Sequence, residues 1–167
     1  MNAKKVLLGL TLSLCLPASW GEETADETEA DISAMHVVVE KNPGCGCCDI
    51  WADHLRDHGY TVELSENPKL YDQKKLSGIP PSLYSCHTAQ VGGYFVEGHV
   101  PAQDILALLK LRPDNVKGLA VPGMPLGSPG MEHPRPQAFD TIAVGTDGRT
   151  HVFASHEAGE DFSAASD

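Results

Sequence analysis

The feature that most constrains this chain is a four-residue stretch with three cysteines, Cys45-Gly46-Cys47-Cys48. It follows an apolar run at residues 36–40 that is typical of a β-strand, and it precedes a pattern typical of an amphipathic helix. We therefore expect a strand, a tight turn and a helix whose N-terminus carries the thiols. A helix N-terminus stabilises negative charge, so it favours the thiolate, the form that attacks disulfides and binds soft metals. The stretch thus predicts thiol chemistry.

Residues 1–21 have the pattern of a secretory signal peptide. Lys4 and Lys5 supply the positive start, residues 6–16 form a short apolar run, and residues 19–21 offer a tolerable cleavage site. The apolar run is too short to span a bilayer comfortably, and no later segment approaches the length that a transmembrane helix needs. We therefore expect an exported protein with no membrane span.

The charge and the cysteine layout narrow the possible functions. The formal net charge is -11, which argues against nucleic acid as a partner because phosphates select basic surfaces. Four cysteines follow the signal peptide, and three of them crowd one turn while Cys86 lies elsewhere. Two structural disulfides drawn from that layout would not cross-link a fold efficiently, although disulfides are the default in an exported protein. A role in redox chemistry or metal binding explains these cysteines better than structural disulfides do.

The composition divides the rest of the chain into three parts. Residues 22–34 are acidic and nearly free of apolar side chains, so we predict a disordered leader. Residues 157–167 are predicted to form a flexible acidic tail. Residues 35–156 are then left as one α/β domain, long enough to bury a core of its own.

Hydrophobic periodicity and turn residues give the expected elements of that domain. The order is strand, helix, strand, short helix, hairpin, helix and a second hairpin. The strands are expected at residues 37–40, 60–64, 82–91, 94–100, 139–146 and 149–155, and the helices at 48–58, 67–77 and 101–111. A loop rich in glycine and proline, residues 118–136, is long for a compact domain and is therefore expected to be functional.

The first hairpin permits a prediction about its register. If Gly92 and Gly93 are the two turn residues, Cys86 lies opposite His99 on the neighbouring strand. The Cβ atoms of such cross-strand partners lie within about 5 Å of each other. A thiol and an imidazole that face each other can be metal ligands or a coupled redox pair. The alternative is a half-buried cysteine beside a surface histidine.

As a pure oxidoreductase, the chain would use Cys45 as the attacking thiolate and Cys48 as the resolving thiol, so these two are the candidate catalytic residues. Cys47 would then be a liability, because it could form scrambled disulfides.

As a metal site, the same three cysteines and Cys86 supply four soft ligands, with His99 nearby. Thiolates can bridge metal ions, so this set could hold more than one Cu(I). Zinc is the competing assignment, but its usual pair of well-separated C-x-x-C knuckles is absent. The crowded motif therefore favours copper.

Two further groups of side chains are weaker candidates. Met124 and Met131 lie in the glycine- and proline-rich loop, and their thioether sulfurs suit Cu(I), although packing explains them equally well. His54 and His58 share a helix face, and we interpret them as solvated residues rather than as a metal pair.

Five blocks of sequence, taken together, resemble the CopG-type periplasmic copper-resistance family, which is distinct from the DNA-binding repressors of the same name. The match covers roughly residues 36–155, and the blocks are Lys41–Cys48, Ser85–Ala89, Val91–Tyr94, Val96–Pro101 and Gly118–Met131. The resemblance implies a thioredoxin-like α/β fold, with a central mixed sheet flanked by helices and an added C-terminal β-hairpin. In that class of fold the loop at Gly78-Ile79-Pro80 would face the cysteines with a cis proline.

The same resemblance implies a periplasmic copper-binding protein that interconverts Cu(I) and Cu(II) in copper resistance. Carried over by residue, Cys45, Cys47 and Cys48 are the copper thiolates, Cys86 and His99 are further ligands, and Met124 and Met131 belong to a capture or transfer loop. Copper ions and other periplasmic copper-handling proteins are the expected partners. Two alternatives stay open: a copper chaperone or buffer without turnover, and a thiol–disulfide oxidoreductase.

Overall fold

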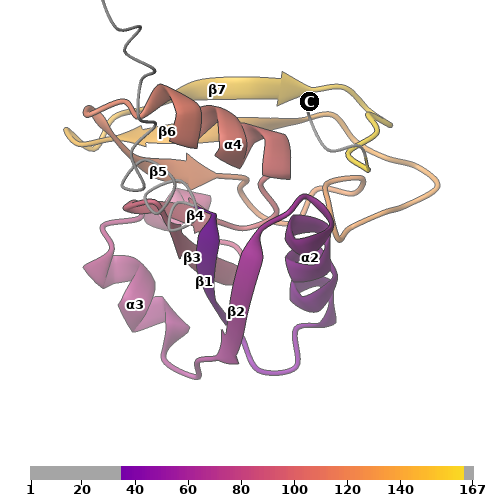
Figure 1. The fold of residues 1–167 in the computed structure, drawn as a ribbon, viewed down its shortest axis with the longest axis horizontal. Helices are drawn as coiled ribbons and strands as arrows, with labels where there is room; N and C mark the ends of the chain where they lie inside the picture. The colour runs from indigo at the N-terminus through magenta and orange to yellow at the C-terminus, as the bar shows by residue number, and fades with distance from the viewer. Residues whose placement is uncertain (1–34, 164–167) are drawn as a thin grey trace, which may run out of the picture.

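A seven-stranded mixed β-sheet organises the chain (Figure 1). The computed structural model describes residues 35–163, so the predicted signal peptide and leader lie outside the described residues. The strands are β1 (His36–Lys41), β2 (Thr61–Glu66), β3 (His87–Val91), β4 (Tyr94–Glu97), β5 (Val116–Ala120), β6 (Phe139–Gly145) and β7 (Thr150–His156). The helices are α2 (Gly46–Asp57), α3 (Leu70–Leu76) and α4 (Ala102–Leu111), with a short 3-10 turn, η1 (Pro81–Leu83). No helix in the described part of the chain is long and apolar enough to cross a membrane.

The strand order confirms the predicted α/β class. It runs β2-β1-β3-β4-β5-β6-β7, with the pairs β1–β2 and β4–β5 parallel and the other pairs antiparallel. A parallel pair needs a crossover connection, and α2 and α4 supply the two crossovers. The strands β6 and β7 form the expected C-terminal hairpin, which extends the same sheet. This arrangement is compatible with the predicted thioredoxin-like fold.

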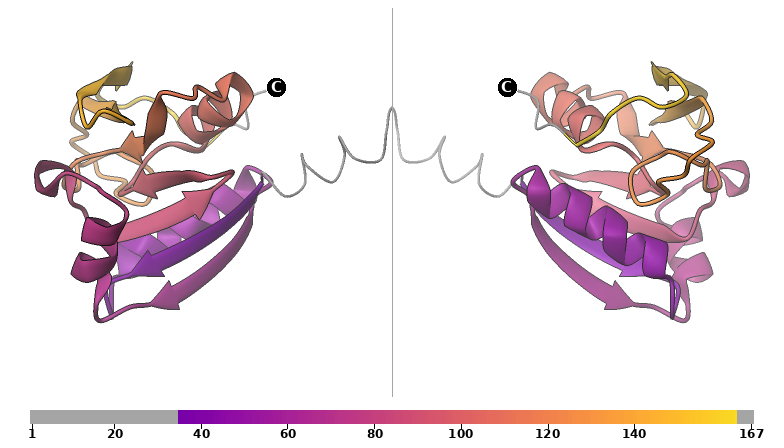
Figure 2. Two further views of the ribbon diagram at one scale, coloured as in Figure 1. Left: turned by 90° about the vertical axis from the view of Figure 1, so that its left-hand side faces the viewer. Right: turned by 90° about the vertical axis from the view of Figure 1, so that its right-hand side faces the viewer.

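The helices cover the sheet on both faces, so the core has two parts (Figure 2). On one face, Trp51 and Leu55 of α2 pack with Ile105 and Leu108 of α4 in one buried cluster. On the other face, a smaller cluster forms around Phe95 of β4 and the segment that includes η1. Because α2 is held against this larger core, its first turn is fixed at the end of β1.

The cysteine turn is anchored by a buried lysine at the end of β1. The helix α2 begins two residues earlier than predicted, so that Cys45 is its N-cap residue and Cys47 lies in its first turn. The ammonium of Lys41 donates to the carbonyl of Cys45 at 3.2 Å and to the Asp49 carboxylate at 2.6 Å. These bonds join the end of β1 to the first turn of α2 and hold the motif between them.

The predicted loop at residues 118–136 is wrong at its start, where the structure has strand β5. Gly118 lies so close to Phe95 that a Cβ atom would collide with the Phe95 carbonyl oxygen, so only glycine fits there. Leu119 and Ala120, which follow it, are fully buried. In a sequence, a buried parallel strand is a short apolar run without alternation. Here, neighbouring glycine and proline residues made this run look like part of a loop.

The hairpin β3–β4 is shorter than predicted, and the expected cis proline is absent. Cys86 lies just before β3 rather than within it, because the chain from residue 81 forms η1 and a bend first. Within residues 35–163 every peptide bond is trans. Pro80 precedes Pro81, which is the first residue of η1, and both fit an extended-to-turn transition without a cis bond.

The interpretation of His54 as a solvated residue is also wrong. Its Nε2 accepts a hydrogen bond from the backbone N–H of Ala102, at 3.1 Å, where α4 begins. Burial lowers the pKa of His54 to about 4, and the neighbouring His58 contributes to the shift. His54 is therefore neutral in the folded protein and joins α2 to α4.

This contact makes stability depend on pH in a defined direction. The unfolded chain binds a proton at His54 below a pKa of 6.5, whereas the folded chain does so only near pH 4. The unfolding free energy should therefore fall as the pH drops from 6.5 towards 4. We measure the unfolding free energy by urea denaturation at pH 7 and at pH 5. Between these pH values it should fall by about 1–2 kcal/mol less in His54→Gln than in the wild type. The exposed His151→Gln is the control, and an equal decrease in all three proteins would contradict the assignment.

Candidate metal centre

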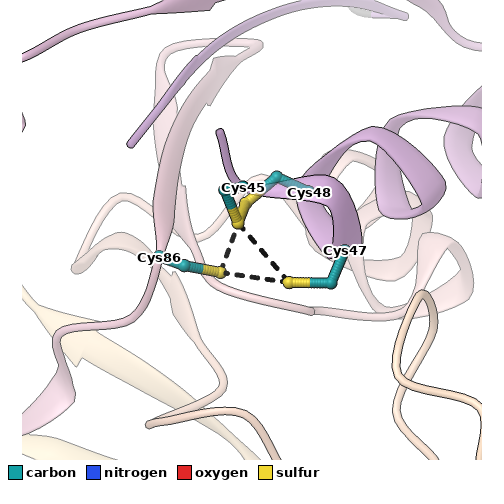
Figure 3. A group of neighbouring side chains, drawn as sticks. All are labelled: Cys45, Cys47, Cys48 and Cys86. Atoms are coloured by element: carbon teal, nitrogen blue, oxygen red, sulfur yellow. Dashed lines mark hydrogen bonds between the residues drawn. A yellow bond between two sulfur atoms is a disulfide. The ribbon is translucent and has the colours of Figure 1, made fainter. Parts of the chain in front are cut away.

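Four cysteine sulfurs converge where α2 begins and β3 begins (Figure 3). Cys45 and Cys48 are joined by a disulfide, whereas Cys47 and Cys86 are free. The Cys86 sulfur lies 3.3 Å from that of Cys48 and 4.0 Å from that of Cys47, and the Cys45 and Cys47 sulfurs are 3.4 Å apart. Cys47 and Cys86, which are 39 positions apart in the chain, thus have their sulfurs close together.

The hairpin brings His99 to the same point, as the register predicted. Val91 pairs with Tyr94 and Thr88 with Glu97, and Cys86 and His99 lie just beyond this ladder, at the open end of the hairpin. The Sγ of Cys86 lies 3.2 Å from the Nε2 of His99. The predicted juxtaposition of thiol and imidazole is confirmed.

A backbone carbonyl fixes the tautomer of His99. Its Nδ1 lies 2.8 Å from the carbonyl oxygen of Pro129. A carbonyl can only accept, so Nδ1 carries the proton and the lone pair is on Nε2, which faces Cys86. An outer hydrogen bond of this kind is what orients metal-binding histidines. Burial also lowers the pKa of His99, which keeps the ring neutral and able to ligate.

His87 is a site residue that the sequence analysis missed. Its ring is fully buried between Trp51, at 4.2 Å between centroids, and His99, at 5.0 Å. Its Nδ1 is 3.6 Å from the Cys86 sulfur, while its Nε2 has no hydrogen-bond partner. Burial holds its pKa well below the usual range. The one signal in the sequence was its position next to Cys86.

Burial disfavours ionisation of the Cys86 thiol. The surrounding protein raises the pKa of its thiol to about 11, and the neighbouring Cys47 adds to the effect. At neutral pH the thiol is therefore protonated unless a positive charge replaces the proton. A metal ion supplies that charge, and its binding would release the proton.

A buried ion pair supports the segment that carries Cys86 and His87. The carboxylate of Glu97 accepts hydrogen bonds from the backbone N–H of Ser85, the hydroxyl of Thr88 and the ammonium of Lys74. Lys74 and Glu97 are both fully buried. Because Glu97 reaches residues on both sides of Cys86 and His87, it fixes where their side chains point.

The methionine loop borders the cysteine turn. A Cβ atom on Gly130 would lie 2.8 Å from the Cys47 carbonyl, so the loop packs directly on the first turn of α2. Met131 follows it and is half-buried, whereas Met124 is 51% exposed. Ligation by the two methionines stays a prediction.

The donor atoms fall into two overlapping groups that share Cys86. One group is the four cysteines, and the other is Cys86 with His87 and His99; in each, the donor atoms lie within 4.8 Å of one another. Two thiolates bound to one metal ion at about 2.3 Å are separated by roughly 3.3–4.0 Å at ordinary bond angles. The separations of 3.3, 3.4 and 4.0 Å fall in that range, whereas Cys45 and Cys48 are bonded to each other as a disulfide. The chemistry of the donors suits a soft or borderline metal ion.

Comparisons with known proteins find similar chains. Residues 83–131 match a family described as a protein of unknown function, DUF411. Two solved structures, described as copper resistance protein CopG in forms 1 and 2, are each 40% identical to the chain, with TM-scores of 0.70 and 0.69. They cover 74% and 72% of this chain, and 98% and 97% of their own length is matched. A comparison with curated proteins finds no match.

The buried ion pair generates a prediction about stability. Lys74→Met leaves the Glu97 carboxylate buried without its cation, so the unfolding free energy should fall by about 3–5 kcal/mol. Lys75→Met, at the exposed neighbouring position, should change it by less than about 0.5 kcal/mol. Urea denaturation followed by circular dichroism measures both. A similar loss in the two variants would mean that the pair does not hold this segment.

Proposed function

The chain belongs to the CopG family of copper resistance proteins, and on this premise we propose that it binds copper at the Cys/His centre and interconverts Cu(I) and Cu(II). The observation that carries the proposal is the convergence of the other three cysteine sulfurs and two imidazoles on Cys86. Thiolates stabilise Cu(I), whereas imidazole nitrogen accepts either oxidation state. A centre with both kinds of donor side by side can hold copper before and after an electron is transferred.

Copper fits this donor set better than zinc. A structural zinc site takes four ligands in a closed tetrahedron, most often from two separated knuckles. Here three sulfurs come from one helical turn, and the fourth, Cys86, also faces two histidines. A thiolate in that position can bridge two ions, so the centre has room for more than one copper.

The Cys45–Cys48 pair can donate electrons as a dithiol and accept them as a disulfide. As a disulfide, the two sulfurs are not thiolate ligands, which leaves Cys47, Cys86 and the two histidines. As a dithiol, the pair restores the four-sulfur set that favours Cu(I). Two Cu(II) ions can take one electron each as the two thiols lose their protons and form the disulfide, which balances electrons and charge. The reverse reaction oxidises two Cu(I) ions.

This chemistry would take place in the periplasm. The signal-peptide pattern of residues 1–21 supports export. There, the protein would exchange Cu(I) with other copper-handling proteins. The ion would leave the centre past the loop that carries Met124 and Met131.

A thiol–disulfide oxidoreductase is the second candidate, because the Cys45–Cys48 disulfide is the arrangement that such enzymes use. Cys47 separates the two functions. A dithiol enzyme has no need of this sulfur, whereas a copper centre loses a ligand without it.

We therefore expect Cys47→Ser to bind Cu(I) at least tenfold more weakly than the wild type, since a hydroxyl is a poor ligand for a soft ion. Copper per chain and sulfur-to-copper absorption, measured after anaerobic loading, report the loss. His151→Asn, at an exposed position away from the centre, should bind like the wild type. Unchanged binding by Cys47→Ser, together with intact disulfide exchange on a model dithiol, would favour the second candidate.

A second measurement tests the redox step. Fully reduced protein mixed with excess Cu(II) under argon should yield two Cu(I) ions for each Cys45–Cys48 disulfide formed, counted with a Cu(I)-specific chelator and by peptide mapping. Cys48→Ser should form no such disulfide and reduce less copper. Stoichiometric copper uptake without any change of oxidation state would identify a buffer instead.

A further inference from the structure

A groove beside the metal centre is not used by the proposed chemistry. It has a volume of about 340 Å³ and lies between α2, the glycine-rich loop and the C-terminal segment. Its apolar lining includes Ile50, which is 52% exposed, together with Pro129 and Phe162. In the C-terminal wall, the ring of Phe162 is buried and packs against Phe139 and His156. We call this the helix–loop–tail groove.

The polar lining of the groove is strongly acidic. It carries five carboxylates and no lysine or arginine: Asp53, Asp57, Glu132, Glu160 and Asp161. Asp53 is paired with Arg56, and Glu160 with His156. The other three make no ion pair with a lysine or arginine within residues 35–163. With its pKa lowered to about 4, His54 adds no compensating charge at neutral pH.

We propose that the helix–loop–tail groove is a docking site for a basic segment of a partner protein, with lysine or arginine side chains beside an apolar one. Apolar side chains of the segment would cover Ile50 and Phe162, while its cations meet the carboxylates. The one such segment near the N-terminus of the chain, Lys4 and Lys5 before an apolar run, belongs to the predicted signal peptide. Residues 22–31 are acidic, and a second copy brings a net charge of -11, so both are repelled from this surface.

The position of the groove connects docking to the metal centre. Pro129 lines the groove, and its carbonyl oxygen is the acceptor that orients His99. Gly130, the next residue, packs on the backbone of Cys47 and Trp51. A protein seated in the groove therefore contacts the loop that separates it from the copper ligands. Such a partner is well placed to exchange copper or electrons, although docking itself does not require copper to be bound.

The test uses the metal-free full chain and a defined probe. The probe is a seven-residue capped peptide in which three lysines alternate with leucines, and its counterpart has glutamates in place of the lysines. With ¹⁵N-labelled protein, we expect the basic peptide to shift the amide resonances of groove residues and the acidic peptide to shift none. Raising the salt from 50 to 200 mM should weaken the binding, because the contacts are exposed.

Matched charge variants decide whether the groove or only the net charge matters. Asp57→Asn with Asp161→Asn should raise the peptide Kd by about fivefold, since two exposed charge contacts are lost. Asp72→Asn with Asp114→Asn removes the same charge from exposed sites outside the groove lining and should have little effect. Equal weakening by both pairs, resonance shifts scattered over the surface, or no binding at millimolar peptide would each overturn the proposal. None of these outcomes depends on copper binding or turnover.

Discussion

The pairing of β3 with β4 across Gly92-Gly93 is the constraint on which the rest of the site depends. Both glycines have positive φ, 54° and 89°, as a two-residue hairpin turn of the primed type requires. This turn sets the register of β3 and β4, and Cys86 and His99 lie close together just beyond the paired residues, at the open end of the hairpin. A slip of one residue would reverse every side chain of a strand and send one of these donors to the other face of the sheet. A side chain on Gly92 would also collide with Leu109 of α4.

The donors are held in place before any metal ion arrives. Lys41 holds the cysteine turn, Glu97 and Lys74 hold the segment around Cys86, and the Pro129 carbonyl holds His99. These contacts are short, buried or both, so the side chains that converge on the centre have little freedom to lose. Preorganisation of this kind lowers the entropic cost of binding. It also suits a centre that changes oxidation state, because a rigid frame limits the rearrangement that accompanies electron transfer.

Much of this could be predicted from the sequence because its signals are local. The cysteine turn followed from a strand pattern beside a helix pattern, and the Cys86–His99 pair from a two-residue turn. Strand β5 could not be recognised in the same way, because its assignment depends on burial between β4 and β6 and on the close approach of Gly118 to Phe95. His87 was missed, and His54 was misinterpreted, for a related reason. The role of each depends on a residue far away in the chain, Trp51 for the first and Ala102 for the second.

The central claim is that sulfur and imidazole donors converge on copper at Cys86. X-ray absorption at the copper edge tests it most directly, on reduced protein loaded with Cu(I) and on the same protein after oxidation. We expect a sulfur-dominated shell at about 2.3 Å in the Cu(I) form, with a larger share of imidazole nitrogen after oxidation and a loss of that nitrogen in His99→Ala. A copper shell of oxygen and nitrogen alone in both forms, unchanged by His99→Ala, would contradict the account.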